Sequence, residues 1–207
     1  MTSALPASSS PGGAWSFDCH TYPDDAAACV AEDALAGTVA EGGCWSDAAF
    51  RGGGALYRDP LRPSAGAPHP DLVVWQRISE GGGPGGVASC DTPVLFGEGP
   101  GAGEVCQGQL ADRWLLNAVS LACTDRAMLM RLFVSSRYRT KGLYTLKFFK
   151  AGQWRYVHVD DTIPCNHLRV PIFARGNNPN ETGVMLVEKA FAKIHGCYEN
   201  LLYGATE

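Results

Sequence analysis

The sequence predicts an α+β fold, in which helices and strands occupy separate stretches of the chain. Residues 113–123 carry apolar side chains on nearly all faces of a helix, which is typical of a buried central helix. Two strand-like runs follow, separated by Ala151 and Gly152, and they predict a β-hairpin. Apolar residues recur at helical spacing between Val187 and Leu201, so we expect a long C-terminal amphipathic helix.

The chain before these elements divides into two parts by composition. Residues 1–14 are rich in serine, proline, glycine and alanine, so we expect a disordered N-terminal tail. Residues 15–45 form a glycine- and alanine-rich segment in which Ala26–Leu35 should be a short helix. Glycine and proline recur up to residue 104, and this pattern favours loops with short helices.

The central helix has a recognisable start. Asp112 stands directly before Arg113, and aspartate is a favoured N-cap residue because its carboxylate accepts hydrogen bonds from the free N–H groups of the first turn. We therefore expect a helix that begins at Arg113 and is capped by Asp112. Thr124 and Asp125 should then start a second helix over Arg126–Val134.

The hairpin strands should be Leu143–Lys150 and Gln153–Asp160, which are rich in aromatic and β-branched residues. The hairpin should end by Pro164, and a polar loop should run on to Asn180. In the last helix, the residues expected to face the core are Val187, Ala190, Phe191, Ile194, Tyr198 and Leu201.

Composition excludes several classes of function. The 207 residues are 45% hydrophobic and 18% charged with a formal net charge of −4, which suits one domain or one and a half and not a disordered polyelectrolyte. Scattered lysines and arginines on a mildly acidic chain do not predict nucleic-acid binding. No apolar run is long enough to cross a bilayer, and the N-terminus does not resemble a signal peptide. We therefore expect no transmembrane segment and an intracellular, cytoplasmic location.

Eight cysteines are spread singly along the chain, and no CxxC pair occurs. This spacing argues against a zinc site or a redox motif, so we expect free thiols, no zinc and no organic cofactor. Most of these thiols should be buried, because free cysteine packs as a small hydrophobic residue.

The most informative stretch is Cys106–Leu116, where Gln107 precedes a loop and then the start of the central helix. This order is similar to that of papain-like proteases. A helix N-terminus carries a partial positive charge and free N–H groups, so a cysteine placed there ionises easily to a nucleophilic thiolate. A backbone N–H and a glutamine amide beside it can stabilise the oxyanion of the intermediate.

The stretch resembles the calpain family, in which Gln-Gly-x-Leu-Gly-Asp-Cys-Trp opens the catalytic helix. Four further segments resemble that family: residues 46–59, Trp75–Arg77, Trp154–Pro164 and Glu188–Glu199. The last of these is nearly identical to its Glu-Lys-Ala-Tyr-Ala-Lys helix, and details near Asn180 are similar to divergent protist calpain-like proteins. The resemblance implies that residues 46–207 are the first subdomain of a papain-like calpain core, with the second subdomain absent.

The first departure from the family is Arg113, which stands where the family has its catalytic cysteine. A guanidinium stays protonated and has no lone pair with which to attack a carbonyl. Gln107 keeps the position that the resemblance assigns to the oxyanion hole, and Asp112 and Trp114 keep the positions flanking the nucleophile. Arg113 could form a salt bridge with Asp112 or another carboxylate, or point into solvent; we favour solvent.

The second departure is length. Papain-like proteases place their catalytic His and Asn roughly 130–150 residues after the cysteine, whereas only 94 residues follow Arg113 in this 207-residue sequence. We therefore expect those partners to lie outside it. Cys106 and Cys123 cannot replace the nucleophile, because Cys106 precedes the helix by several residues and Cys123 lies at its far end.

The resemblance also implies a calcium site. The family's carbonyl ligands correspond to Gly97 and Gly99, and its acidic ligands correspond to Glu104 and Glu181. Calcium prefers carboxylate and carbonyl oxygens, so the chemistry is suitable. The alternative is that both glutamates are solvated loop charges, since Glu104 replaces a shorter aspartate of the family.

These features support three readings of function. The first is a proteolytically inactive calpain homologue that acts as a binding, regulatory or scaffold module for a protein partner, such as a cytoskeletal or regulatory protein. The second is a fragment of a calcium-dependent cysteine endopeptidase, completed by the missing second subdomain. The third is a calcium sensor. The first is favoured by Arg113.

Overall fold

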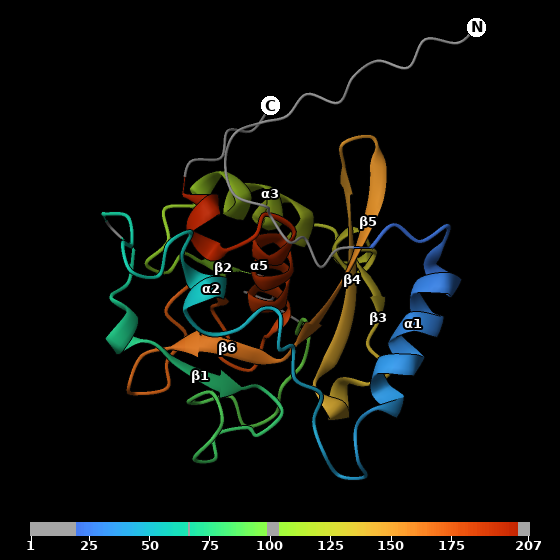
Figure 1. The fold of residues 1–207 in the computed structure, drawn as a ribbon, viewed down its shortest axis with the longest axis horizontal. Coiled ribbons are helices and arrows are strands. Elements are labelled where there is room, and N and C mark those ends of the chain that lie inside the picture. The colour runs from blue at the N-terminus through green and yellow to red at the C-terminus, as the bar shows by residue number, and fades with distance from the viewer. Residues whose placement is uncertain (1–19, 66, 99–103, 203–207) are drawn as a thin grey trace, which may run out of the picture.

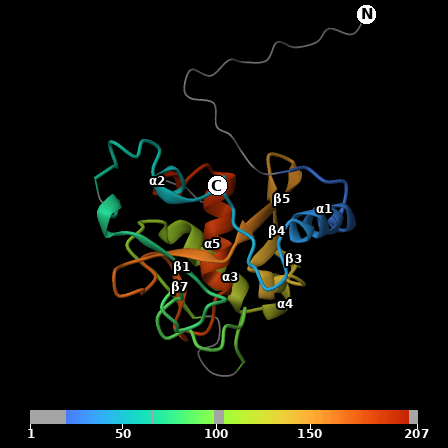
Figure 2. The same ribbon diagram turned by 60° about the horizontal axis from the view of Figure 1, so that its bottom comes forward.

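The computed structural model describes residues 20–65, 67–98 and 104–202, so the predicted tail at 1–14 and residues 15–19 lie outside the described residues. A three-stranded antiparallel sheet of β3, β4 and β5 stands at one side of the molecule, with helix α1 on one of its faces (Figure 1). Helix α5 packs against the strands β4 and β5. Turning the molecule shows that α3 and α5 lie on the side of the sheet away from α1 (Figure 2).

The central hairpin has the predicted bounds: β4 is Leu143–Lys150 and β5 is Gln153–Asp160. Their register pairs Lys150 with Gln153 across a two-residue turn. Both turn residues have positive φ, 52° at Ala151 and 75° at Gly152, as this tight hairpin turn requires. Successive side chains along each strand point to opposite faces of the sheet.

On one face of the sheet, helix α1 spans Asp25–Gly37 around the predicted Ala26–Leu35. Its N-cap Asp24 accepts a hydrogen bond from the Ala27 N–H at 2.8 Å. The contact with the sheet is polar, because the buried Glu32 accepts a hydrogen bond from the Thr145 hydroxyl at 2.9 Å.

On the opposite face, helix α5 spans Gly183–Ile194. It ends there and does not continue to Leu201 as predicted, because Gly196 adopts a φ of 95° that breaks the helix. Tyr198–Leu201 form a separate 3₁₀ turn, η3. The helix is also buried on almost every side, including the polar residues Glu188, Lys189 and Lys193, so it is not simply amphipathic.

Helix α3 spans Arg113–Cys123 and is followed by α4 at Arg126–Met130. The predicted helix over Arg126–Val134 is wrong in its second half, because Phe133–Ser135 form strand β3. This strand pairs with β4, Phe133 lying opposite Leu146. The pairing buries Phe133 and supplies the backbone hydrogen bonds that a helix would otherwise have made.

The remaining elements form the side of the molecule that carries α3. Strand β1 (Val74–Arg77) pairs with β6 (Thr162–Cys165), and β2 (Val105–Cys106) pairs with β7 (Arg175–Gly176). Short helical turns complete the fold: α2 at Gly52–Leu56, η1 at Pro70–Leu72 and η2 at Arg139–Lys141. Within the described ranges, no helix has the length and apolar character needed to span a membrane.

Candidate functional site

The start of helix α3 is the place where sequence analysis locates the site. Leu115, Leu116 and Val119 bury one face of the helix, while Leu121 on the opposite face is 71% exposed. The helix is thus less enclosed than its apolar composition predicts. Its N-terminus follows strand β2 through a short loop that carries Gln107.

Arg113 is the first residue of α3 and is exposed to solvent. Its side chain makes no hydrogen bond or ion pair with any described residue, so a salt bridge with Asp112 does not form. A guanidinium at this end of a helix meets the positive pole of the helix dipole, which is unfavourable. The structure therefore places a solvated cation where the family resemblance expects an attacking sulfur.

Asp112 does not cap the helix as predicted, because no hydrogen bond joins its side chain to the first turn. Asp112 is fully buried. Among the described residues, no backbone N–H group and no basic or hydroxyl side chain donates a hydrogen bond to either of its carboxylate oxygens. Its neighbour is a second acid, Glu188 of α5, which is also buried. The Glu188 carboxyl accepts hydrogen bonds from the Ala174 N–H at 3.2 and 3.1 Å.

Two carboxyl groups can hydrogen-bond to each other only when one of them carries a proton. Burial raises the pKa of Glu188 well above its ordinary value, and repulsion by Asp112 raises it further. Burial also raises the pKa of Asp112. We therefore expect the pair to share a proton, which gives one of the otherwise unpartnered oxygens of Asp112 a hydrogen bond. Sequence analysis missed this pair, since its only signal was one acid in each of two separate motifs.

The two other residues predicted at the helix start have different surroundings. Gln107 is exposed, and its side-chain amide donates to the carbonyl oxygen of Leu110 at 2.9 Å. Trp114 is half-buried; its indole N–H donates to the Leu201 carbonyl at 2.8 Å, and its ring packs edge-on against Phe191. Gln107 thus lies on the same exposed end of the molecule as Arg113, while Trp114 fastens α3 to η3 and α5.

The cysteines supply no substitute nucleophile at this point of the described chain. The seven cysteines in the described ranges are free thiols, and Cys106 is half-buried on β2. Burial raises the pKa of Cys90 to about 11 and that of Cys165 to about 12, so these thiols remain protonated near neutral pH.

The residues predicted to hold calcium are partly brought together, and Gly99 lies outside the described residues. The Gly97 N–H donates to Glu181 Oε1 at 3.1 Å, and Glu181 is buried. Glu104 accepts a hydrogen bond from the Asn177 side chain at 2.9 Å, close to the β2–β7 pairing. These oxygens are of the type that calcium prefers.

One contact opposes a cation at this loop. Nη1 of Arg126 donates to the Gly97 carbonyl at 3.3 Å and to Glu98 Oε1 at 3.2 Å. No group of three acidic, cysteine or histidine side chains in the described part of the chain is close enough to hold a metal ion. The available ligand atoms are therefore of the kind that calcium prefers, namely two acidic side chains and one carbonyl. That carbonyl, of Gly97, already accepts a hydrogen bond from the Arg126 cation.

Comparison with known proteins identifies the family. A family model described as "Calpain family cysteine protease" matches residues 57–207, which is most of the chain. The chain belongs to the calpain family. Its α+β structure and its C-terminal motifs agree with the calpain core that the resemblance predicts.

Individual calpains are similar over about two thirds to three quarters of this chain. Calpain-type cysteine protease ADL1 of Oryza sativa subsp. japonica is 36% identical over 74% of the chain, and Calpain-5 of Caenorhabditis elegans is 34% identical over 64%. Calpain-8 of Homo sapiens is 29% identical over 74%. The matched part covers only 7%, 20% and 22% of these three relatives, so the chain corresponds to a small part of each.

Proposed function

We propose that this calpain-family chain does not cleave peptide bonds and acts by binding a protein partner, as a regulatory or scaffold module. The observation that carries the proposal is Arg113, exposed at the start of α3. Calpain-type catalysis needs a thiolate at this position, and a guanidinium can neither attack a carbonyl nor form a covalent intermediate.

A peptidase assay on the purified chain tests this proposal. We expect no hydrolysis of casein in the presence of calcium, with or without a thiol-blocking reagent. Hydrolysis that calcium activates and thiol blockade abolishes would contradict the proposal. The position itself can be probed with Arg113→Cys, since a thiol at a helix N-terminus has a lowered pKa and should react rapidly with iodoacetamide at neutral pH.

The matched control for that probe is Arg131→Cys, because Arg131 is also exposed but lies just after α4, at its C-cap. We expect the thiol at position 113 to be alkylated about tenfold faster than the one at position 131. Equal rates would mean that the start of α3 does not activate a thiol, and the site would then not be a degenerate catalytic one.

The second candidate is a piece of a calcium-dependent cysteine endopeptidase. It is supported by the names of the relatives and by the small share of their length that the chain covers. Even in a longer protein, Arg113 would block attack on the substrate, so activity would require Arg113→Cys. An assay of a longer chain that includes the catalytic His and Asn would distinguish the two candidates. Peptidase activity with Arg113 intact would favour the enzyme.

We also propose that the loop around Gly97 binds calcium weakly, through the Gly97 carbonyl, Glu104 and Glu181, with Gly99 as a further ligand. Its support is the closeness of Gly97 and Glu181. Calcium should raise the melting temperature, and Glu104→Ala should abolish that rise. The control is Glu41→Ala, an exposed acid in a distant loop, which should leave the rise unchanged. No rise in the wild-type chain would contradict the site.

An intracellular location and a cytoskeletal or regulatory partner belong to the same proposal. The exposed face of α3 is a suitable surface, because Leu121 is exposed on the helix that begins with the exposed Arg113. Affinity capture from cells with wild-type chain and with Leu121→Glu would test it. A cytoskeletal protein captured equally by both would place the partner on another face.

A further inference from the structure

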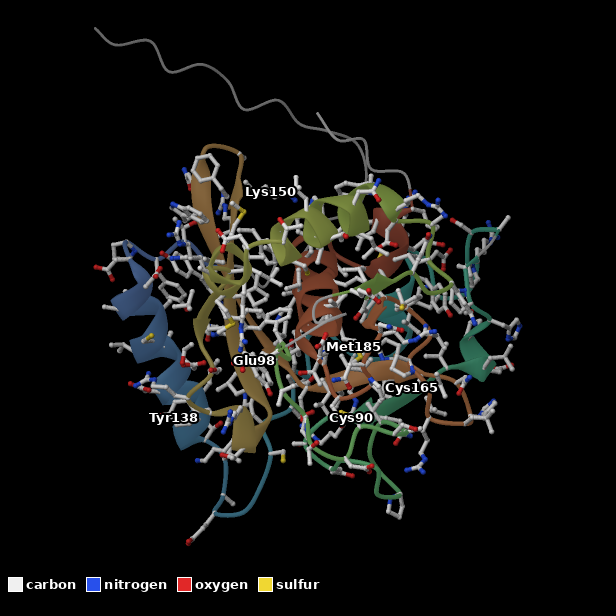
Figure 3. All side chains as sticks on the ribbon, turned by 180° about the vertical axis from the view of Figure 1, so that it is seen from behind. Cys90, Glu98, Tyr138, Lys150, Cys165 and Met185 are labelled. Carbon is white, nitrogen blue, oxygen red and sulfur yellow. The ribbon has the colours of Figure 1, made fainter. Side chains whose placement is uncertain are left out.

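A cavity of about 300 Å³ lies between β7, the start of α5 and the loops that precede β2 and β7. Met185, labelled in Figure 3, is the α5 residue in its wall. The apolar part of the lining is Val87, Val170, Pro171 and Met185, and the polar part includes Ser89 and Arg175. This volume is at the lower end for ligand sites, so a small group would fill it.

Arg175 is the unusual residue of the lining. It is half-buried on β7, and its guanidinium has no hydrogen bond or ion pair with any residue in the described ranges. Burying a charge without a partner is costly, so partly buried guanidinium groups are normally paired.

The neighbouring acids do not supply that partner. Glu181 also lines the cavity, but its Oε1 accepts from the Gly97 N–H, and it is not in ion-pair distance of Arg175. Glu104 accepts from the Asn177 side chain. Arg175 is therefore a cation without a direct ion pair, in the wall of a cavity that several apolar residues and Glu181 also line.

We propose that this cavity binds a carboxylate carried on a short apolar body, such as the C-terminal residue of a partner peptide. The guanidinium of Arg175 can hold a carboxylate through two parallel hydrogen bonds. Ser89 in the same lining offers a hydroxyl, while Val87, Val170 and Met185 offer contact to an aliphatic side chain. The site is independent of Arg113, and it shares Glu181 with the proposed calcium site.

The test is an NMR titration of the purified chain with N-acetyl-leucine and with its amide, N-acetyl-leucinamide, in EGTA so that calcium is absent. We expect the free acid to bind and the amide to bind at least about tenfold more weakly, because the amide cannot accept the charge-assisted hydrogen bonds that a carboxylate accepts from a guanidinium. Arg175→Gln should lose the preference for the acid, and Arg175→Lys should keep part of it.

The matched control is Arg131→Gln, which removes an exposed arginine just after α4 and should leave binding unchanged. If Arg175→Gln does not fold, Ala88→Leu, which narrows the same cavity, replaces it and should weaken binding of the acid. The proposal would be overturned by absence of binding, by equal binding of acid and amide, or by unchanged binding in these cavity variants. If inorganic sulfate binds as tightly as N-acetyl-leucine, the apolar residues of the cavity do not contribute to binding, and that part of the proposal would be overturned.

Discussion

Among the regions that bury acidic side chains, two satisfy them in opposite ways. Along α5, Lys189 donates to Asp160 and Lys193 donates to Asp47 at 2.8 Å, so each buried acid has a buried base. At the start of α3, Asp112 lies against Glu188, and only a proton relieves their repulsion.

Adjacent residues of one helix thus have contrasting partners. Glu188 turns toward α3 and Lys189 toward the end of the hairpin, because successive side chains of a helix point about 100° apart. The Lys189–Asp160 pair holds α5 to the sheet through opposite charges, whereas the contact between Asp112 and Glu188 depends on pH. Three predictions test this contrast.

The largest effect should come from Lys189→Met, which leaves Asp160 buried without its cation. We expect a loss of about 3–5 kcal/mol in the free energy of unfolding, measured by urea denaturation. Lys147→Met is the control, because Lys147 pairs with the half-exposed Asp25 at 2.6 Å and should cost less than about 1 kcal/mol. Similar losses in the free energy of unfolding for the two variants would show that the buried Lys189–Asp160 pair contributes no more to stability than the Lys147–Asp25 pair.

The second prediction concerns the pH range between the ordinary pKa of a carboxyl group and the raised pKa of the Asp112–Glu188 pair. The pKa values of Asp112 and Glu188 are raised in the folded state, so their contribution to stability is present at low pH and is lost as the pH rises through the raised value. Between the ordinary carboxyl pKa and that raised value, the wild-type chain should lose about 1.4 kcal/mol per pH unit for the one shared proton, and the slope should vanish above it. Glu188→Gln should remove this slope, since its amide can donate to Asp112 without titrating.

Other groups face the same pair and titrate at high pH. They are Tyr198 of η3, which interacts electrostatically with both acids, and Cys165 of β6, which interacts with Tyr198. Asp160 of β5 also interacts with Tyr198, but it titrates at low pH, because Lys189 lowers its pKa against the effect of burial. Burial raises the pKa of Tyr198 and Cys165, and all three remain in Glu188→Gln, so the difference between the two urea-unfolding profiles isolates the pair. Parallel profiles for wild type and variant would refute the shared proton.

The smallest effect should come from Arg113→Glu. Replacing a cation by an anion in the first turn of α3 removes an unfavourable interaction with the helix dipole and adds a favourable one. We expect a gain of about 0.3–1 kcal/mol in the free energy of unfolding at low salt, with Arg113→Gln in between. A loss of stability would indicate that Arg113 has a favourable contact in solution.

Local patterns were sufficient for part of the fold. The hairpin strands were predicted with their observed bounds, because the Ala151-Gly152 turn and the flanking aromatic residues act over short distances. The helix around Ala26–Leu35 was likewise predicted, and Asp24 caps it as a local signal should. Position 113 also needed no coordinates, since a guanidinium lacks a nucleophile in any surroundings.

Long-range contacts explain where local reasoning failed. Asp112 has the right residue type for a cap, but burial beside Glu188, far away in the sequence, takes its carboxylate away from the first turn. Phe133 and Val134 continue a helical pattern, yet pairing with β4 makes them a strand.

What the residues alone determined are the start of α3 at Arg113, the tight turn and the presence of a guanidinium at position 113, because these depend on the chemistry of one residue or of close neighbours. What only the tertiary structure decided is which buried charges meet: Lys189 with Asp160, Asp112 with Glu188, and Arg175 with no described residue at all. Electrostatic interactions act through space, and their strength is set by the burial and distance that the complete fold creates.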